Sequence, residues 1–361
     1  MIHESYKDAR AAFLQAARDR SVAISEHPLS GAQGREGEVL AMDVAVVGEP
    51  AAPKALLVVS GEHGLEGLPG SGAQLDLLLH VPDPPKDTKV VLVHALNPWG
   101  FSHGSRGNED NVDVNRNFVD FDVPYVRNVA FDEIFPFMCP QDWTDDAFDH
   151  AAAQTKRVLD EHGGAFVLTG TTGGQRHEPT GTNYGGAGPS WTRRTLEQIV
   201  AEHLASCEKV AFVDWHSGFG EHGELFHLCT HAEGSAPLDR VASWWGRDAV
   251  TRNATAFQGA GGALPNWQGM FATFLPGLIP NAAVAGSVIE FGTFPNAQVR
   301  AAIMIDRFLR FGRTNRSSLS RDALRQQMLT AFAPADAAWR AAILARASEA
   351  HQQALEGLAA W

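Results

Sequence analysis

Residues 60–70 read Ser-Gly-Glu-His-Gly-Leu-Glu-Gly-Leu-Pro-Gly, and they join two elements of different periodicity. The run before them, at 55–59, is unbroken in its apolar character and has a length that suits a strand buried on both faces. After them, Ser71 is expected to cap a helix, because apolar residues from Leu75 onwards recur at helical spacing. The stretch is therefore predicted to be a glycine-rich turn at the carboxyl end of a central strand, where open α/β sheets bind ligands.

A histidine and a glutamate lie on this predicted turn. His63 and Glu66 are three residues apart, and an imidazole and a carboxylate at this spacing can reach one cation if the glycines let the backbone bend. A bare His-x-x-Glu also occurs in loops without a function, so the pattern alone leaves both interpretations open.

A third candidate ligand stands far along the chain. A catalytic zinc site needs three protein ligands and one open coordination position. His216 follows the short apolar run at 210–213 and precedes glycine-rich chain, so it too is expected at the end of a core strand. Together with His63 and Glu66 it makes a candidate site for one zinc ion.

Composition narrows the classes of protein. The 361 residues include 29 basic and 42 acidic side chains, for a net charge of −13, which argues against nucleic acid or an anionic membrane as the partner. The first residues lack a secretory pattern and no apolar run is long enough to cross a membrane, so a cytoplasmic location is expected. Cys139, Cys207 and Cys229 are far apart and are expected to be buried without forming a disulfide.

The polar segment at 105–118 is predicted to line a cleft. It carries Arg106 and Arg116 among short polar residues, with little apolar periodicity. A guanidinium suits a carboxylate or a developing oxyanion. In the alternative interpretation, these arginines pair with the neighbouring acids of a solvated loop.

A second polar segment, at 170–190, is rich in glycine, threonine and proline and is expected to form a long loop over the cleft. Arg176, His177 and Tyr184 on this loop are candidates for substrate binding. Near the other end of the motif region, Glu290 follows the apolar run at 284–289. A carboxylate in such a position costs free energy unless it is paired or functional.

The remaining pattern predicts an α/β architecture in one domain over residues 1–361, with the motifs between about 55 and 295 and a helical C-terminal extension from about 319 to 361. Strands are expected at 39–47, 55–59, 90–93, 165–169, 210–213, 225–228 and 284–289. Helices are expected at 6–18, 191–206, 296–311 and over most of 320–358.

Four ordered blocks resemble the zinc carboxypeptidase superfamily. They are Gly-Glu-His-Gly-x-Glu-Gly, Asn-Pro-x-Gly, Val-Asp-Val-Asn-Arg-Asn-Phe and Asp-x-His-Ser, and the resemblance extends from about Val58 to Phe294, roughly two thirds of the chain. The superfamily includes the carboxypeptidase A-like peptidases and the succinylglutamate desuccinylase and aspartoacylase branch, and this sequence looks closest to a bacterial branch. The resemblance implies a three-layer α/β/α fold around a mostly parallel, mixed and twisted sheet, with zinc bound by His63, Glu66 and His216.

The resemblance also implies roles for further residues. Asp113 resembles the carboxylate that orients the first histidine ligand. Asn115 and Arg116 match the pair that holds a substrate carboxylate. Arg106 resembles the arginine that polarises the scissile carbonyl, and Glu290 matches the general base.

The implied activity is zinc-dependent hydrolysis of an amide bond beside a free carboxylate, with a small peptide or an N-acyl amino acid as substrate. The tyrosine that carboxypeptidase A-type peptidases carry on a mobile loop has no match shortly before Glu290, so strict carboxypeptidase activity is not predicted. Two alternatives remain open at this point. Two histidines with one carboxylate also suit a non-haem iron oxygenase, and the chain could be a member that binds a ligand without catalysis.

Overall fold

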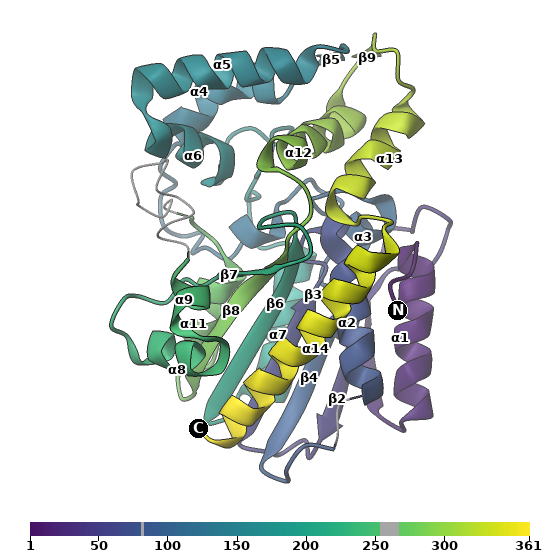
Figure 1. Ribbon diagram of the computed structural model, residues 1–361, viewed down its shortest axis with the longest axis vertical. Helices are drawn as coiled ribbons and strands as arrows, with labels where there is room; N and C mark the ends of the chain where they lie inside the picture. Colours follow the sequence, from purple (N-terminus) through teal and green to yellow (C-terminus); the bar gives the residue numbers. More distant parts are fainter. Residues whose placement is uncertain (81–82, 253–266) are drawn as a thin grey trace.

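A seven-stranded sheet forms the centre of the computed structural model, which describes residues 1–80, 83–252 and 267–361 (Figure 1). The strand order is β1-β2-β4-β3-β6-β8-β7. The strands are β1 (Ala23–Pro28), β2 (Ala41–Gly48), β3 (Lys54–Ser60), β4 (Thr88–His94), β6 (Lys209–Ser217), β7 (Leu225–Leu228) and β8 (Ala283–Phe291). The four middle strands, β4, β3, β6 and β8, are parallel, whereas β1, β2 and β7 pair antiparallel at the two sides.

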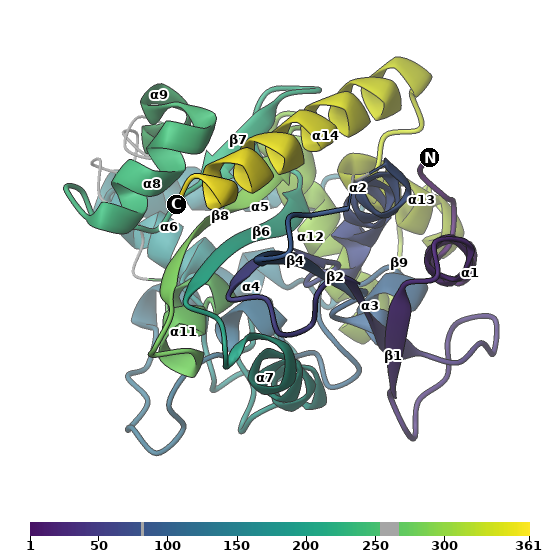
Figure 2. The same ribbon diagram turned by 90° about the horizontal axis from the view of Figure 1, so that it is seen from below.

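Helices cover both faces of the sheet and make the three layers that the resemblance implied (Figures 1 and 2). One face packs against α1 (Tyr6–Asp19), α2 (Gly67–His80), α8 (Ala236–Trp245), α9 (Arg247–Thr251) and α14 (Ala337–Ala359). The other face packs against α7 (Trp191–Leu204) and α11 (Phe271–Leu278). Residues 55–59 of β3 are fully buried, which confirms the strand predicted from their apolar run.

A third group of helices lies beyond the carboxyl ends of the middle strands, at the top of Figure 1. It consists of α4 (Val129–Met138), α5 (Ala147–His162), α6 (Gly164–Thr172), α12 (Asn296–Phe311) and α13 (Arg321–Phe332), and we call it the helical cap. The cap has an apolar cluster of its own, centred on residues such as Phe131, Phe308 and Phe332. A short pairing of β5 (Asp142–Trp143) with β9 (Thr314–Asn315) ties its two segments together.

The strand predicted at 165–169 is wrong, because these residues belong to helix α6. A short apolar run does not by itself distinguish a strand from a helix. In the helix, the Thr169 and Thr172 hydroxyls donate to the carbonyls of residues four positions earlier, at 2.8 Å each, and so have partners within α6.

One smaller prediction also fails, and one strand was missed. Ser71 does not cap α2, because the helix begins at Gly67 and the Ser71 hydroxyl lies inside it, 2.8 Å from His94 Nε2. Strand β1 was not predicted, because its residues are mostly half exposed and lack a clear apolar pattern. The expected helices at 6–18, 191–206, 296–311 and over most of 320–358 are confirmed, and the three cysteines, all within the described ranges, are buried and form no disulfide.

None of the helices in the described ranges is both long and apolar enough to span a bilayer.

Candidate metal centre

The carboxyl ends of three parallel strands bring the predicted ligands together. His63 follows β3 and precedes a single helical turn, η1 (Gly64–Glu66), which places Glu66 beside it. His216 is the next-to-last residue of β6, and Glu290 stands directly opposite it in the register of β8. Partners in such a register project from the same face of the sheet, so Glu290 is delivered to the side chains around His216.

The glycines of the motif are required by the geometry of the turn. Gly61 has a φ of +70°, which L side chains rarely adopt. Gly64 approaches α3 (Pro98–His103) so closely that an added Cβ would lie 1.9 Å from the carbonyl carbon of Gly100. The turn therefore packs backbone against backbone, and this packing fixes the positions of His63 and Glu66.

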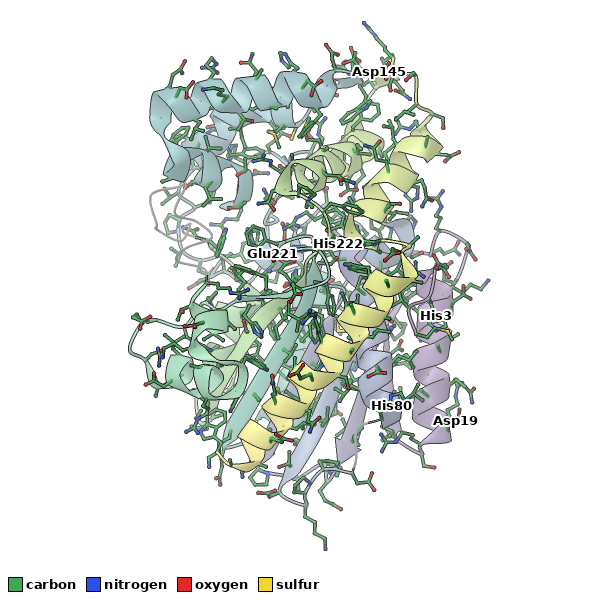
Figure 3. All side chains as sticks on the ribbon, in the orientation of Figure 1. His3, Asp19, His80, Asp145, Glu221 and His222 are labelled. Atoms are coloured by element: carbon green, nitrogen blue, oxygen red, sulfur yellow. The ribbon has the colours of Figure 1, made fainter. Side chains whose placement is uncertain are left out.

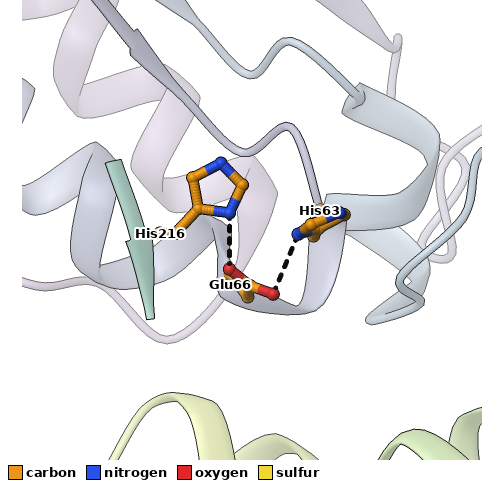
Figure 4. Close-up of side chains that lie close together, drawn as sticks. All are labelled: His63, Glu66 and His216. Carbon is orange, nitrogen blue, oxygen red and sulfur yellow. Dashed lines mark hydrogen bonds and ion pairs between the residues drawn. The ribbon is translucent and has the colours of Figure 1, made fainter. Parts of the chain in front are cut away.

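The three candidate ligands face one another in a buried cluster (Figure 4). Glu66 stands between the two histidines: its Oε1 lies 3.0 Å from His63 Nδ1, and its Oε2 lies 3.1 Å from His216 Nδ1. Their ligand atoms all fall within 4.8 Å of one another, and each residue is at most 4% exposed. The structure therefore has a His-Glu-His group able to hold a metal ion.

The surroundings of both imidazoles fit a cation. Asp113 Oδ1 lies 3.1 Å from His63 Nε2, so that ring presents Nδ1 to the cluster. That Nδ1 is buried and lacks a hydrogen-bond partner with good geometry among the described residues, although Glu66 is near. A borderline-soft ion such as zinc prefers two imidazole nitrogens and a carboxylate oxygen of this kind.

The pKa shifts of His216 and Glu66 also fit a site for a cation. Burial works to lower the pKa of His216, but the charge of Asp214 and hydrogen bonds to the carboxylates of Asp214, Glu62 and Glu66 raise it well above its ordinary value. Burial works to raise the pKa of Glu66, but the neighbouring His63 charge and a hydrogen bond from His216 hold it below its ordinary value. The carboxylates around the two rings thus favour positive charge at this position, which a bound divalent cation would also supply.

Two acids of the cluster were missed as site residues from the sequence. Glu62 and Asp214 are fully buried, and each places an oxygen 3.2 Å from His216 Nε2. Burial and then the charge of Asp214 raise the pKa of Glu62 to about 7. The available signal was their position: each is an acid beside a ligand histidine at the end of a buried strand, where an unpaired carboxylate is costly.

Arg106 lies between two carboxylates of the site. Its Nε donates to Asp113 at 3.0 Å, and its Nη1 lies 3.4 Å from Glu66 Oε1. The backbone N–H of Arg106 donates to the buried Asp306 of α12 at 2.8 Å, so the cap helix holds this loop in place. The alternative interpretation, in which the arginines of a solvated loop pair with neighbouring acids, is therefore only partly correct. Arg106 does pair with Asp113, but it does so in a buried site.

Asn115 and Arg116 form part of the turn η2 (Val114–Arg116). Asn115 Oδ1 accepts a hydrogen bond from the N–H of Phe271, and its Nδ2 makes no bond to the described residues. The Arg116 guanidinium donates through Nε and Nη2 to the carbonyl of Thr172 and through Nη1 to the carbonyl of Asn115. A guanidinium has five N–H groups, so two remain for a ligand.

A cavity of about 440 Å³ opens onto this cluster. The three candidate ligands, Arg106, Asn115, Arg116 and Glu290 all line it. Arg176 and Tyr184 are not among the described residues of its lining. Arg176 lines a second cavity of about 430 Å³ and stacks over the ring of Tyr125 at 4.8 Å, while Tyr184 contributes its carbonyl oxygen to the N–H of Asp113.

His177 also lies away from the cluster. Its Nε2 is 2.7 Å from Asp132 and its Nδ1 is 3.0 Å from the Tyr125 hydroxyl, in a network that joins the 174–184 segment to α4. The structure therefore brings together seven of the residues predicted for ligand, catalytic or carboxylate-binding roles, with Asp113 behind His63, and leaves Arg176, His177 and Tyr184 outside.

Comparison with known proteins places the chain in a family. The family described as "Protein of unknown function (DUF2817)" matches residues 3–346, and the chain belongs to it. No curated protein matches the sequence.

Similar solved structures include two that are described as carboxypeptidases. Carboxypeptidase A from Helicoverpa armigera has 14% sequence identity and a TM-score of 0.46, with 97% of this chain and 74% of that chain covered. Bovine thrombin-activatable fibrinolysis inhibitor, in complex with tick carboxypeptidase inhibitor, has 10% identity and a TM-score of 0.47, with 96% and 98% covered. A metallo-carboxypeptidase from Pseudomonas aeruginosa has 12% identity and a TM-score of 0.40, with 94% and 68% covered. At these values the functional interpretation rests on the geometry of the site itself.

Proposed function

We propose that the protein is a zinc-dependent hydrolase that cleaves an amide bond beside a free carboxylate. The observation that carries this proposal is the convergence of His63, Glu66 and His216 in a cavity that also contains one further carboxylate and three candidate substrate-binding groups. The further carboxylate is Glu290, and the same proposal assigns it the role of general base.

The metal would be held by His63 Nδ1, Glu66 and His216 Nδ1, with Asp113 fixing the orientation of the first ring. A zinc ion in such a site supplies Lewis acidity, which lowers the pKa of bound water towards ~7 and polarises a carbonyl oxygen. The remaining steps belong to side chains of this chain.

Glu290 suits proton transfer because of where it lies. It lines the cavity, and its Oε2 lies 3.4 Å from the N–H of Phe219, a long contact that leaves the carboxylate largely available. Burial, followed by the charge of Glu66, raises the pKa of Glu290 to about 7. A carboxylate with this pKa can accept the proton of an attacking water at Oε and return it to the leaving nitrogen. A cation bound beside it would lower this pKa.

Arg106, Asn115 and Arg116 divide the substrate between them in this proposal. Arg106 is held by Asp113 beside Glu66, so its guanidinium is positioned to stabilise the oxyanion of a tetrahedral intermediate. The Nδ2 of Asn115 and the two remaining N–H groups of Arg116 are donors suited to a carboxylate. A substrate with a carboxylate next to its scissile amide meets both sets of groups at once.

The experiment is a turnover assay of the zinc-loaded protein on a panel of short peptides and N-acyl amino acids. The Glu290→Gln variant keeps the size of the side chain and removes the base, so kcat/KM is expected to fall about 10²- to 10⁴-fold while bound zinc is unchanged. Glu221→Gln is the matched control, because Glu221 is exposed and is not among the residues that line the cavity; its side chain is labelled in Figure 3.

An equal rate in Glu290→Gln and the parent protein would remove Glu290 from the mechanism. No turnover on any member of the panel, with zinc bound, would contradict the hydrolase itself. If iron is the dominant metal and the protein takes up oxygen, the proposed hydrolase is wrong and the protein is an oxygenase.

A further inference from the structure

The lining of the catalytic cavity divides into a polar floor and an apolar wall. The floor consists of the residues at the carboxyl ends of the strands, described above. The wall comes from the helical cap, where Thr171, Thr172, Asn296 and Arg300 also line the cavity, and its larger part is apolar: Ile134, Met138, Leu159, Val167, Leu168 and Ile303. None of these apolar side chains offers a strong hydrogen bond, so the wall is suited to an apolar group.

Helix α6 leaves apolar surface uncovered on its cavity side. Phe166, Val167 and Leu168 are consecutive, yet all three are only half-buried, and Leu159 of the neighbouring α5 is 41% exposed. Val167, Leu168 and Leu159 line the cavity, whereas Phe166 lines the second cavity and stacks on His162 with ring centroids 4.5 Å apart. No side chain of the described residues covers this face completely, and apolar surface of this kind is what a ligand with an apolar group would bury.

The same helix also positions the proposed carboxylate-binding arginine. Thr172 is the last residue of α6, and its carbonyl accepts hydrogen bonds from Arg116 Nε at 2.9 Å and from Nη2 at 2.7 Å. Helix α6 therefore fixes the position of the apolar wall relative to the Arg116 guanidinium. A ligand that binds Arg116 with a carboxylate has the wall within reach.

We propose that the substrate carries a hydrocarbon group of several carbons and that this group binds against the wall formed by α4, α5, α6 and α12. The inference rests on the proposed function and specifies the chemical class of its substrate. Two sources can supply such a group: the side chain of the residue that bears the carboxylate, or the acyl chain on the other side of the amide. Both present the same methylene surface to the wall.

The test measures affinity rather than turnover. Dissociation constants are measured by calorimetry on the zinc-loaded full chain for two homologous series without a hydrolysable amide. The first consists of N-propyl-, N-hexyl- and N-nonylglycine, and the second consists of alanine, norvaline and norleucine. Binding is expected to tighten about fourfold for each methylene that reaches the wall, the value expected for burial of one methylene. Tightening in the first series assigns the wall to an acyl chain, and tightening in the second assigns it to a side chain.

Two variants locate the effect. Leu168→Trp fills the cavity side of α6 and is expected to abolish the dependence on chain length. Val167→Thr has the same shape, is less demanding of the fold, and is expected to weaken the dependence by placing a hydroxyl in the wall. Phe166→Leu, on the same helix but facing the second cavity, is the control and should leave the dependence unchanged.

The outcomes separate this inference from the proposed function. Affinity that is flat with chain length in both series would overturn the apolar wall, even if amide turnover is observed. A chain-length dependence that persists unchanged in Leu168→Trp and Val167→Thr would place the hydrocarbon elsewhere and would also overturn it. A dependence that these variants remove, in a protein without amide turnover, would keep the wall and refute the hydrolase.

Discussion

His94 and His216 follow similar local patterns in the sequence but have different surroundings in the structure. Both follow apolar runs at the carboxyl ends of parallel strands, β4 and β6, which lie on either side of β3, and both are buried. His216 faces Glu62, Glu66 and Asp214. His94 instead stacks on the ring of Phe13 at 4.5 Å, with the Ser71 hydroxyl as its polar contact.

The difference appears in the acidity of the two rings. The acids around His216 raise its pKa well above the ordinary value in spite of burial. Burial, assisted by the charge of Arg10, lowers the pKa of His94 to about 3. A third buried histidine, His351 of α14, resembles His94: it accepts a hydrogen bond from Trp215 Nε1, and burial lowers its pKa to about 3. In this chain, the surrounding carboxylates distinguish the candidate ligand His216 from the buried histidines His94 and His351.

The largest expected effect is a loss of folding stability at low pH that is caused by a buried histidine of the core. Unfolded histidine has a pKa of about 6.5, so below that pH the unfolded chain takes up a proton that His351, with its lowered pKa, does not. The neutral His351 ring therefore makes its full contribution to the free energy of unfolding above about pH 6.5. This contribution is lost as the pH falls towards 3, by about 1.4 kcal/mol per pH unit.

Urea unfolding of the parent protein and of His351→Gln measures this effect. Glutamine still accepts the Trp215 hydrogen bond but does not titrate. The stability advantage of the parent over the variant should shrink by about 3 kcal/mol between pH 7.5 and pH 4.5. His150→Gln, at an exposed position of α5, is the control. An advantage that stays constant over this pH range would show that His351 does not remain neutral.

A smaller effect is expected from the acid behind the first ligand. Asp113→Asn keeps an oxygen that accepts from His63 Nε2 but removes the charge that holds the ring and pairs with Arg106. Zinc affinity should fall about 10- to 100-fold, as measured by competition with a chelator. Asp110→Asn changes an exposed acid of the same segment and should bind zinc as the parent does. Equal affinity in the two variants would contradict the orienting role of Asp113.

The sequence predicts the sheet edge better than it predicts the cap. The middle strands are predicted by their apolar runs, and His63, His216 and Glu290 were found as candidates because each follows such a run. An apolar run does not predict the direction of the side chain at the end of the strand. For this reason His94 and His216 cannot be distinguished by sequence pattern.

The cap could not be derived in the same way. Helix α6 was predicted as a strand because residues 165–169 form a short apolar run, and its apolar residues line two different cavities instead of a sheet face. The positions of Arg176 and Tyr184 outside the cavity of the candidate metal centre depend on how the 174–184 segment folds against α4, a long-range contact that local pattern does not encode. Glu62 and Asp214 stood in the quoted motifs, but their shared contact with His216 is visible only in three dimensions.

Zinc content is the most direct test of the account, because every proposed role depends on a metal held by His63, Glu66 and His216. Elemental analysis of the purified protein, of His216→Ala and of His94→Asn compares the two histidines in one measurement. The account predicts one zinc per chain in the parent and in His94→Asn, and none in His216→Ala. One zinc per chain retained in His216→Ala would contradict it.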